Sequence, residues 1–224
     1  MAAEKLIGIV VEKKDFNDYD QLVTFLCPIF NKKITFLAQG VRKINSKNAV
    51  NLQMFSIIEA EVFLSRNFSK ISKLKKAYLL KEYDFSNAFV QITLDKVKFI
   101  FSNTERINNS FLKLYFHVLD KFKTEECNWW MSILLANSPL ILPIRPSSIK
   151  CSECGSVNKL VQFSWHLGGM KCKFHSNSIT PYNMLLNYYF LFNNFEKYVK
   201  SANIYQNELI QKELLNFFTE NGYF

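Results

Sequence analysis

Four residues that commonly bind metal ions stand in two closely spaced pairs in the second half of the chain. Cys151 and Cys154 form a Cys-x2-Cys pair, and Cys172 and His175 form a Cys-x2-His pair after a gap of 17 residues. Each pair fits a tight turn that brings two ligands together, and two such turns facing each other make a tetrahedral site. The spacing therefore predicts a small module, residues 151–175, built around one Zn²⁺ ion.

A structural zinc is favoured over a catalytic one, because four protein ligands leave no open position for water. Glu153 is the only acid within the module, and its place inside the first pair makes it a poor general base. A zinc hydrolase or deaminase is the alternative, and it would need water in place of one ligand. His166 lies between the pairs, but His175 has the better spacing. We interpret His166 and His117 as ordinary polar or core histidines.

Residues 1–82 alternate apolar and polar side chains with the period of two that is typical of strands. In the first strand, Ile7, Ile9 and Val11 share one face. Five short strands in this length predict a small barrel, for which the five-stranded OB fold is the natural candidate. An SH3-like barrel fits the pattern nearly as well. The expected strands cover residues 7–11, 22–26, 34–38, 58–64 and 71–80.

Residues 83–150 and 176–224 instead show helical periodicity. Ser86 and Ser110 are the expected N-caps of the first two helices, and Trp129 and Trp130 are expected to pack in a core. We predict an α+β protein with an N-terminal OB-fold barrel and a helical domain that carries an inserted zinc module. The predicted parts are residues 1–82, 83–150, 151–175 and 176–224.

The positive charge is concentrated in the predicted barrel. The chain has a formal net charge of +9, and residues 1–81 hold 14 Lys or Arg against 7 Asp or Glu, a net of +7. A surface of this kind is typical of proteins that bind nucleic acid. The predicted nucleic-acid-binding residues are Lys32, Lys33, Arg42, Lys43, Lys47, Arg66, Lys70, Lys73, Lys75 and Lys76.

Four phenylalanines stand near these charges and can stack on bases, although we favour core packing for each of them. They are Phe16, Phe30, Phe63 and Phe68.

The sequence lacks the marks of several other protein classes. It has no apolar run of about 18 residues, so no transmembrane helix or membrane partner is expected. The N-terminus does not resemble a signal peptide, which favours a cytoplasmic, nucleoid-associated protein. It also lacks a Walker-type phosphate loop, a Gly-x-Ser-x-Gly elbow and a His-Glu-x-x-His motif, which points away from an enzyme. Cys27 and Cys127 are interpreted as small apolar residues.

Six short segments together form a recognisable series along the chain: 8–11 (GIVV), 18–26 (DYDQLVTFL), 33–43 (KITFLAQGVRK), 52–55 (LQMF), 151–155 (CSECG) and 168–172 (GGMKC). In this order they resemble the RecO family of bacterial recombination mediators. His175 departs from the family pattern, where a fourth cysteine is common, and Asn31 stands where the family usually turns with glycine. Asparagine also tolerates left-handed backbone angles.

This resemblance implies a non-enzymatic role in recombinational DNA repair. Such proteins bind single- and double-stranded DNA, anneal complementary strands and help to load recombinase on DNA coated with single-strand-binding protein. The implied partners are RecR and single-strand-binding protein, and the implied cofactor is structural Zn²⁺. A zinc-containing RNA-binding module of the ribosome or of transcription is the main alternative, because it would share the barrel, the charge and the zinc.

Overall fold

The computed structural model describes residues 2–65, 71–141 and 145–223. The chain divides into two compact units, Met1–Lys123 and Thr124–Phe224, and each is described by itself. The earlier division at residues 82, 150 and 175 stays a prediction. Within the described ranges, no helix combines the length and the apolar character that crossing a membrane requires.

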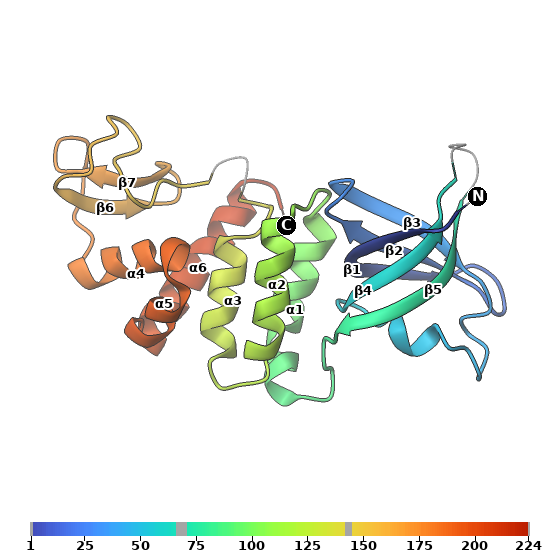
Figure 1. The fold of residues 1–224 in the computed structure, drawn as a ribbon. Coiled ribbons are helices and arrows are strands. Elements are labelled where there is room, and N and C mark those ends of the chain that lie inside the picture. Colours follow the sequence, from blue (N-terminus) through green and yellow to red (C-terminus); the bar gives the residue numbers. More distant parts are fainter. Residues whose placement is uncertain (1, 66–70, 142–144, 224) are drawn as a thin grey trace. The chain divides into compact units, whose positions relative to one another are not determined.

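The first unit begins with a closed barrel of five strands (Figure 1). The strands follow one another around the barrel in the order β1-β2-β3-β5-β4. Only the β3–β5 contact is parallel, and the other pairs are antiparallel. This architecture confirms the OB-like barrel that the alternation predicted. The strand bounds are Glu4–Asp15, Gln21–Cys27, Lys32–Ala38, Ile57–Phe63 and Ser72–Lys81 for β1 to β5.

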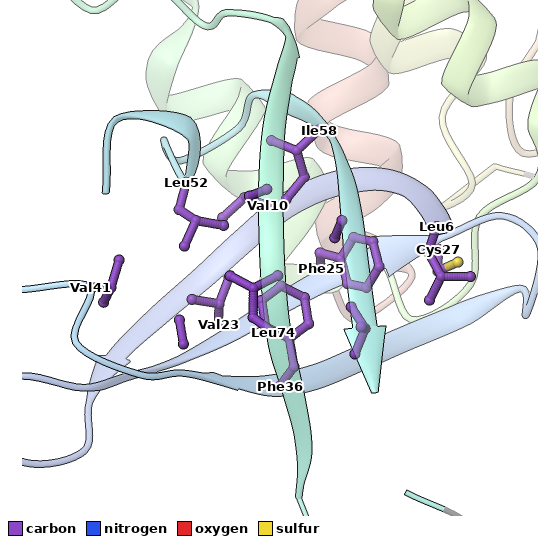
Figure 2. Packing of buried hydrophobic residues seen from close by; sticks show 14 residues of the cluster. Leu6, Val10, Val23, Phe25, Cys27, Phe36, Val41, Leu52, Ile58 and Leu74 are labelled. Carbon is purple, nitrogen blue, oxygen red and sulfur yellow. The ribbon is translucent and has the colours of Figure 1, made fainter. Parts of the chain in front are cut away.

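The barrel interior is filled by apolar side chains from all five strands (Figure 2). Phe25 and Phe36 pack edge to face with ring centroids 5.3 Å apart, and both rings are fully buried. Leu52 enters the same cluster from the segment between β3 and β4. This burial of aromatic and aliphatic area is the main force holding the barrel closed.

The alternation predicted for β1 is correct, but the apolar face that holds Ile7 and Ile9 is not the face that lines the barrel interior. Leu6 and Val10 point into the barrel core, so Ile7 and Ile9 lie on the outer face. Ile9 is nevertheless fully buried, and a bulge shifts the register between Val10 and Glu12. Because both faces of β1 bury apolar residues, alternation alone cannot identify the inner face.

Gly8 lies where β1 approaches β2 too closely for a side chain. A Cβ atom on Gly8 would stand 2.3 Å from the carbonyl oxygen of Leu26 and 2.5 Å from the ring of Phe25. Close backbone approach of this kind is a common reason for glycine inside a strand.

Two helices complete the first unit, α1 (Ala88–Asn103) and α2 (Asn109–Lys121). The predicted N-caps, Ser86 and Ser110, were wrong by one and two residues. The helices are capped by asparagine side chains instead. Asn87 accepts hydrogen bonds from the backbone N–H groups of residues 89 and 90, and Asn108 accepts one from residue 111. Asparagine and serine are about equally good N-caps, so composition could not separate them.

The second unit is mainly helical, and a two-stranded hairpin stands between α3 and α4 in the chain and lies at one end of the unit (Figure 1). Trp130 is fully buried, and the indole N–H of Trp129 donates to the carbonyl oxygen of Ala202 at 2.7 Å. Both tryptophans are therefore structural. The elements are α3 (Cys127–Ala136), β6 (Leu160–Ser164), β7 (Gly169–Cys172), α4 (Tyr182–Asn193), α5 (Phe195–Ser201) and α6 (Ile204–Glu220).

Truncating Phe36 tests the barrel core. Phe36→Ala should lower the free energy of unfolding of the first unit by about 3–5 kcal/mol, because it leaves a cavity beside Phe25. Phe16→Ala is the matched control, since Phe16 is 51% exposed and its loss should change stability by less than about 0.5 kcal/mol. Urea unfolding followed by circular dichroism measures both values. Equal losses for the two variants would contradict this packing.

Candidate metal centre and nucleic-acid interface

The four predicted metal ligands converge on one point of the second unit. The ligand atoms of Cys151, Cys154, Cys172 and His175 all lie within 4.8 Å of one another. The Sγ atoms of Cys154 and Cys172 are 3.8 Å apart, and Nδ1 of His175 lies 3.4 Å from Sγ of Cys172 and 3.7 Å from Sγ of Cys151. A tetrahedral zinc site requires S···S edges of about 3.8 Å and S···N edges of about 3.6 Å. The donors therefore fit one metal ion.

Tight turns hold each pair of ligands. The backbone N–H of Gly155 donates to the carbonyl oxygen of Cys151 at 2.9 Å, and Gly155 has a φ of +72°. The N–H of His175 donates to the carbonyl oxygen of Cys172 at 3.0 Å, which forms the second turn. This left-handed backbone at Gly155 lets the chain reverse directly after the first pair.

A backbone contact ties the module to the segment that enters it. Ser147 donates its N–H to the carbonyl oxygen of Gly168 at 2.9 Å and accepts the N–H of Met170 at 2.7 Å. Gly169 has a φ of +110°, and a Cβ atom there would lie 2.2 Å from the carbonyl oxygen of Ser147. Only glycine permits this approach.

Hydrogen bonds within the cluster favour the thiolate form of Cys151, which is the form that binds metals. Donation from the backbone N–H of Cys154, with smaller contributions from Cys172 and Glu153, lowers the pKa of Cys151 to about 5. The neighbouring sulfur atoms of Cys151, and then of Cys172, raise the pKa of His175. A thiolate is the metal-binding form of cysteine, so the module presents an anionic ligand at neutral pH.

Two charged residues adjoin the cluster. The Lys171 ammonium lies 2.8 Å from Oε1 of Glu153, and Oε2 of Glu153 lies 3.8 Å from Nε2 of His175. Hydrogen bonding from Lys171 lowers the pKa of Glu153. His166 stands apart from the four ligands, half exposed, with Nε2 3.2 Å from a carboxylate oxygen of Glu220.

The remaining two cysteines do not belong to the metal-ligand cluster. Cys27 lies in the barrel core with none of its surface exposed, and Cys127 is 1% exposed at the start of α3. Burial raises the pKa of the Cys27 thiol. Both behave as the small apolar residues that the sequence suggested.

A loop after β3 carries three of the predicted basic residues and is pinned to the β1–β2 turn. Asp20 accepts the N–H of Gly40 at 2.7 Å, and the N–H of Arg42 donates to the carbonyl oxygen of Tyr19 at 2.9 Å. The Lys43 ammonium lies 5.3 Å from the centroid of the Tyr19 ring. Lys43 and the exposed Tyr19 ring line a hollow of about 520 Å³, which the acids Asp18 and Asp20 line as well.

The same loop continues along β5, which carries three more of the predicted basic residues. Ala77 of β5 donates its N–H to Asn48 at 3.0 Å, and its carbonyl oxygen accepts from the side chain of Asn51 at 3.0 Å. Lys47 therefore lies next to this stretch of β5 and is itself exposed. Lys73, Lys75 and Lys76 are exposed on β5.

Some of these basic residues have acidic partners. Arg42 lies 3.1 Å from a carboxylate oxygen of Asp15, and Lys75 lies 2.9 Å from Glu61. All these side chains except that of Glu61 are at least 41% exposed. Exposed pairs of this kind contribute little to stability, so they leave the cations able to bind phosphate.

The other predicted basic residues fall elsewhere. Lys33 pairs with Glu105 at 2.6 Å, and Lys32 is exposed at the start of β3, away from the loop that follows β3. Arg66 and Lys70 lie outside the described residues. Six of the ten predicted residues lie either in the loop after β3 or on β5, to which residues 48 and 51 of that loop are bonded, and we name these six the basic barrel surface: Arg42, Lys43, Lys47, Lys73, Lys75 and Lys76.

The preference for core packing of the nearby phenylalanines was wrong for three of them. Phe16 is 51% exposed, Phe30 39% and Phe63 37%. Phe68 lies outside the described residues. Sequence reasoning also missed Tyr19, which is 55% exposed beside Lys43. Its place in the turn between two strands was the available signal.

Comparisons with known proteins agree with these features. Residues 1–83, the barrel and its exit, match a family model described as "Recombination protein O N terminal". Among similar proteins, "DNA repair protein RecO" of Mycoplasma mycoides is 27% identical over 75% of this chain and 70% of its own length. The protein of that name from Oceanobacillus iheyensis is 26% identical over 76% of this chain and 67% of its own.

A third relative, "DNA repair protein RecO" of Mesoplasma florum, is 36% identical over 36% of this chain and 30% of its own length. Its match is shorter, whereas the first two span both structural units because they cover three quarters of the chain. The barrel is thus similar to the N-terminal part of RecO, and the similarity to proteins named DNA repair protein RecO extends over about three quarters of the chain.

Proposed function

We propose that this chain binds single- and double-stranded DNA through the basic barrel surface and acts as a non-enzymatic mediator of recombinational DNA repair. The observation that carries the proposal is the loop holding Arg42, Lys43 and Lys47, which lies against the lysine-bearing strand β5 on an OB-like barrel. Barrels of this type commonly bind oligonucleotides on strand faces and adjoining loops. The family match over the same residues supports the proposal.

Annealing needs two complementary strands to approach with their charge neutralised and their bases free. Lysine and arginine contacts to phosphate supply the neutralisation without reading sequence. Tyr19 offers an exposed ring on which a base can stack beside the Lys43 charge. The basic barrel surface therefore has the two kinds of group that hold a single strand.

The proposed partners follow from the family: RecR, single-strand-binding protein and the recombinase that is loaded on DNA. The second unit exposes apolar side chains that can dock a protein, including Ile179 at 82% and Tyr205 at 73% exposure. The proposed metal is Zn²⁺, held by three cysteines and His175. It fills its four positions with protein atoms and so serves as a scaffold.

Charge reversal tests the basic barrel surface. Arg42→Glu with Lys43→Glu should weaken binding of every DNA sequence alike, because phosphate contacts are lost. The slope of log K against log[salt] for single strands should fall by about 1.4, at roughly 0.7 for each lost contact. Fluorescence anisotropy at several salt concentrations measures both quantities.

The matched control reverses two exposed lysines on α5, Lys197→Glu with Lys200→Glu, which changes the net charge equally. Binding that falls by the same amount in both double variants would show a general charge effect and remove the two residues from the interface.

Removing the Tyr19 ring tests stacking. Tyr19→Ala should cost about 1–3 kcal/mol of single-strand binding, whereas Tyr19→Phe should retain most of it, because the stacking face remains. Tyr182→Ala, which removes a 75% exposed ring from the second unit, is the control. Unchanged affinity of Tyr19→Ala for single strands would exclude stacking on this ring.

Replacing one ligand tests the metal site. Cys154→Ser should lose bound zinc and lower the thermal stability of the second unit while leaving direct DNA binding nearly unchanged. Cys27→Ala, which removes a thiol from the barrel core, should keep the wild-type zinc content. Elemental analysis of the purified proteins measures the metal. Full zinc content in Cys154→Ser would show that this ligand set is wrong.

A further inference from the structure

The imidazole of His175 faces two different groups. Its Nδ1 atom lies 3.4 Å from Sγ of Cys172 and 3.7 Å from Sγ of Cys151. Its Nε2 atom, on the other side of the ring, lies 3.8 Å from a carboxylate oxygen of Glu153. The ring therefore points Nδ1 at the ligand cluster and Nε2 at an acid that is not a member of the cluster.

An ion pair at the other carboxylate oxygen, Oε1, holds Glu153 in this position. The ammonium of Lys171 lies 2.8 Å from Oε1 of Glu153. Lys171 is 3% exposed, whereas the side chain of Glu153 is 52% exposed. A buried ammonium is costly unless it is paired, so the lysine strongly favours the geometry in which Glu153 turns toward it.

The hairpin fixes the lysine in turn. Lys171 belongs to β7 and directly precedes the ligand Cys172, and its register partner is Gln162 on β6. The chain of contacts thus runs from a paired strand to a buried cation, then to a carboxylate, then to the ring of a metal ligand.

The charges of the group are also matched. Three thiolates and a neutral imidazole around a divalent ion have a formal charge of −1, and Glu153 alone would add to it. The cation of Lys171 offsets that repulsion, which allows a carboxylate to stand next to an anionic centre.

We propose that Glu153 is a positioning residue: Lys171 holds its carboxylate 3.8 Å from Nε2 of His175, where its negative charge favours a proton on Nε2 and keeps Nδ1 free for the metal. Metal-bound histidines commonly donate their second ring N–H to a carboxylate, which fixes the tautomer and the ring orientation. This role rests on the proposed metal site. It is specific to histidine, because a cysteine at position 175 has no ring to orient.

A double-mutant cycle in the full-length protein tests this role. Zinc affinity is measured by competition with a chelator for wild type, Glu153→Ala, His175→Cys and the double variant. Glu153→Ala should weaken zinc binding by about 10- to 100-fold when His175 is present. In the His175→Cys background the same change should weaken it by less than about threefold, because the two effects are then uncoupled.

Two further measurements separate positioning from general damage to the module. The ¹⁵N shifts of the zinc-loaded wild-type protein should place the proton of His175 on Nε2, and Glu208→Ala, at an exposed acid on α6, should leave zinc affinity unchanged. Equal losses from Glu153→Ala in both backgrounds, or no loss in wild type, would overturn the positioning role alone. A wild-type protein that binds no zinc would overturn the metal site itself, and this role with it.

Discussion

Closure of the barrel depends on a short parallel pairing between β3 and β5, in which Phe36 pairs with Ser72 and Leu37 with Lys73. Because β5 stands between β3 and β4 in the barrel, the chain that leaves β3 must pass β5 before it reaches β4. The connecting segment does so, and Asn48 and Asn51 bond to Ala77 on the way. The strand order that closes the barrel thus also places the segment between β3 and β4 against β5.

The electrostatics of the barrel follow from the same arrangement. The side chains of the buried cluster are apolar, whereas acids such as Asp15 and Glu61 lie among the cations outside it. Water screens exposed pairs of this kind, so exchanging a carboxylate for a phosphate costs little free energy. The reversible DNA binding proposed above is compatible with such partners.

The sequence predicted the barrel, the helices and the convergence of four metal ligands, because periodicity and ligand spacing are local properties. The sequence could not identify which face of β1 points into the barrel. Ile9 on the outer face is buried as completely as Val10 on the inner face. The exposure of Phe16 depends on long-range packing. The contact between Glu153 and Nε2 of His175 depends on side-chain orientation, so the ligand spacing alone could not reveal it.

The backbone contact between Ser147 and Gly169 has a thermodynamic meaning. It closes a loop of chain at the entrance of the module, and the four ligands close further loops inside it. A bound ion then acts as a reversible cross-link that reduces the conformational entropy of the unfolded chain, as a disulfide does, but its contribution varies with the free ion concentration. At a thousand times the dissociation constant it would add about 4.1 kcal/mol to stability. If the site binds zinc as proposed, the stability of the second unit would depend on the free zinc concentration around the protein.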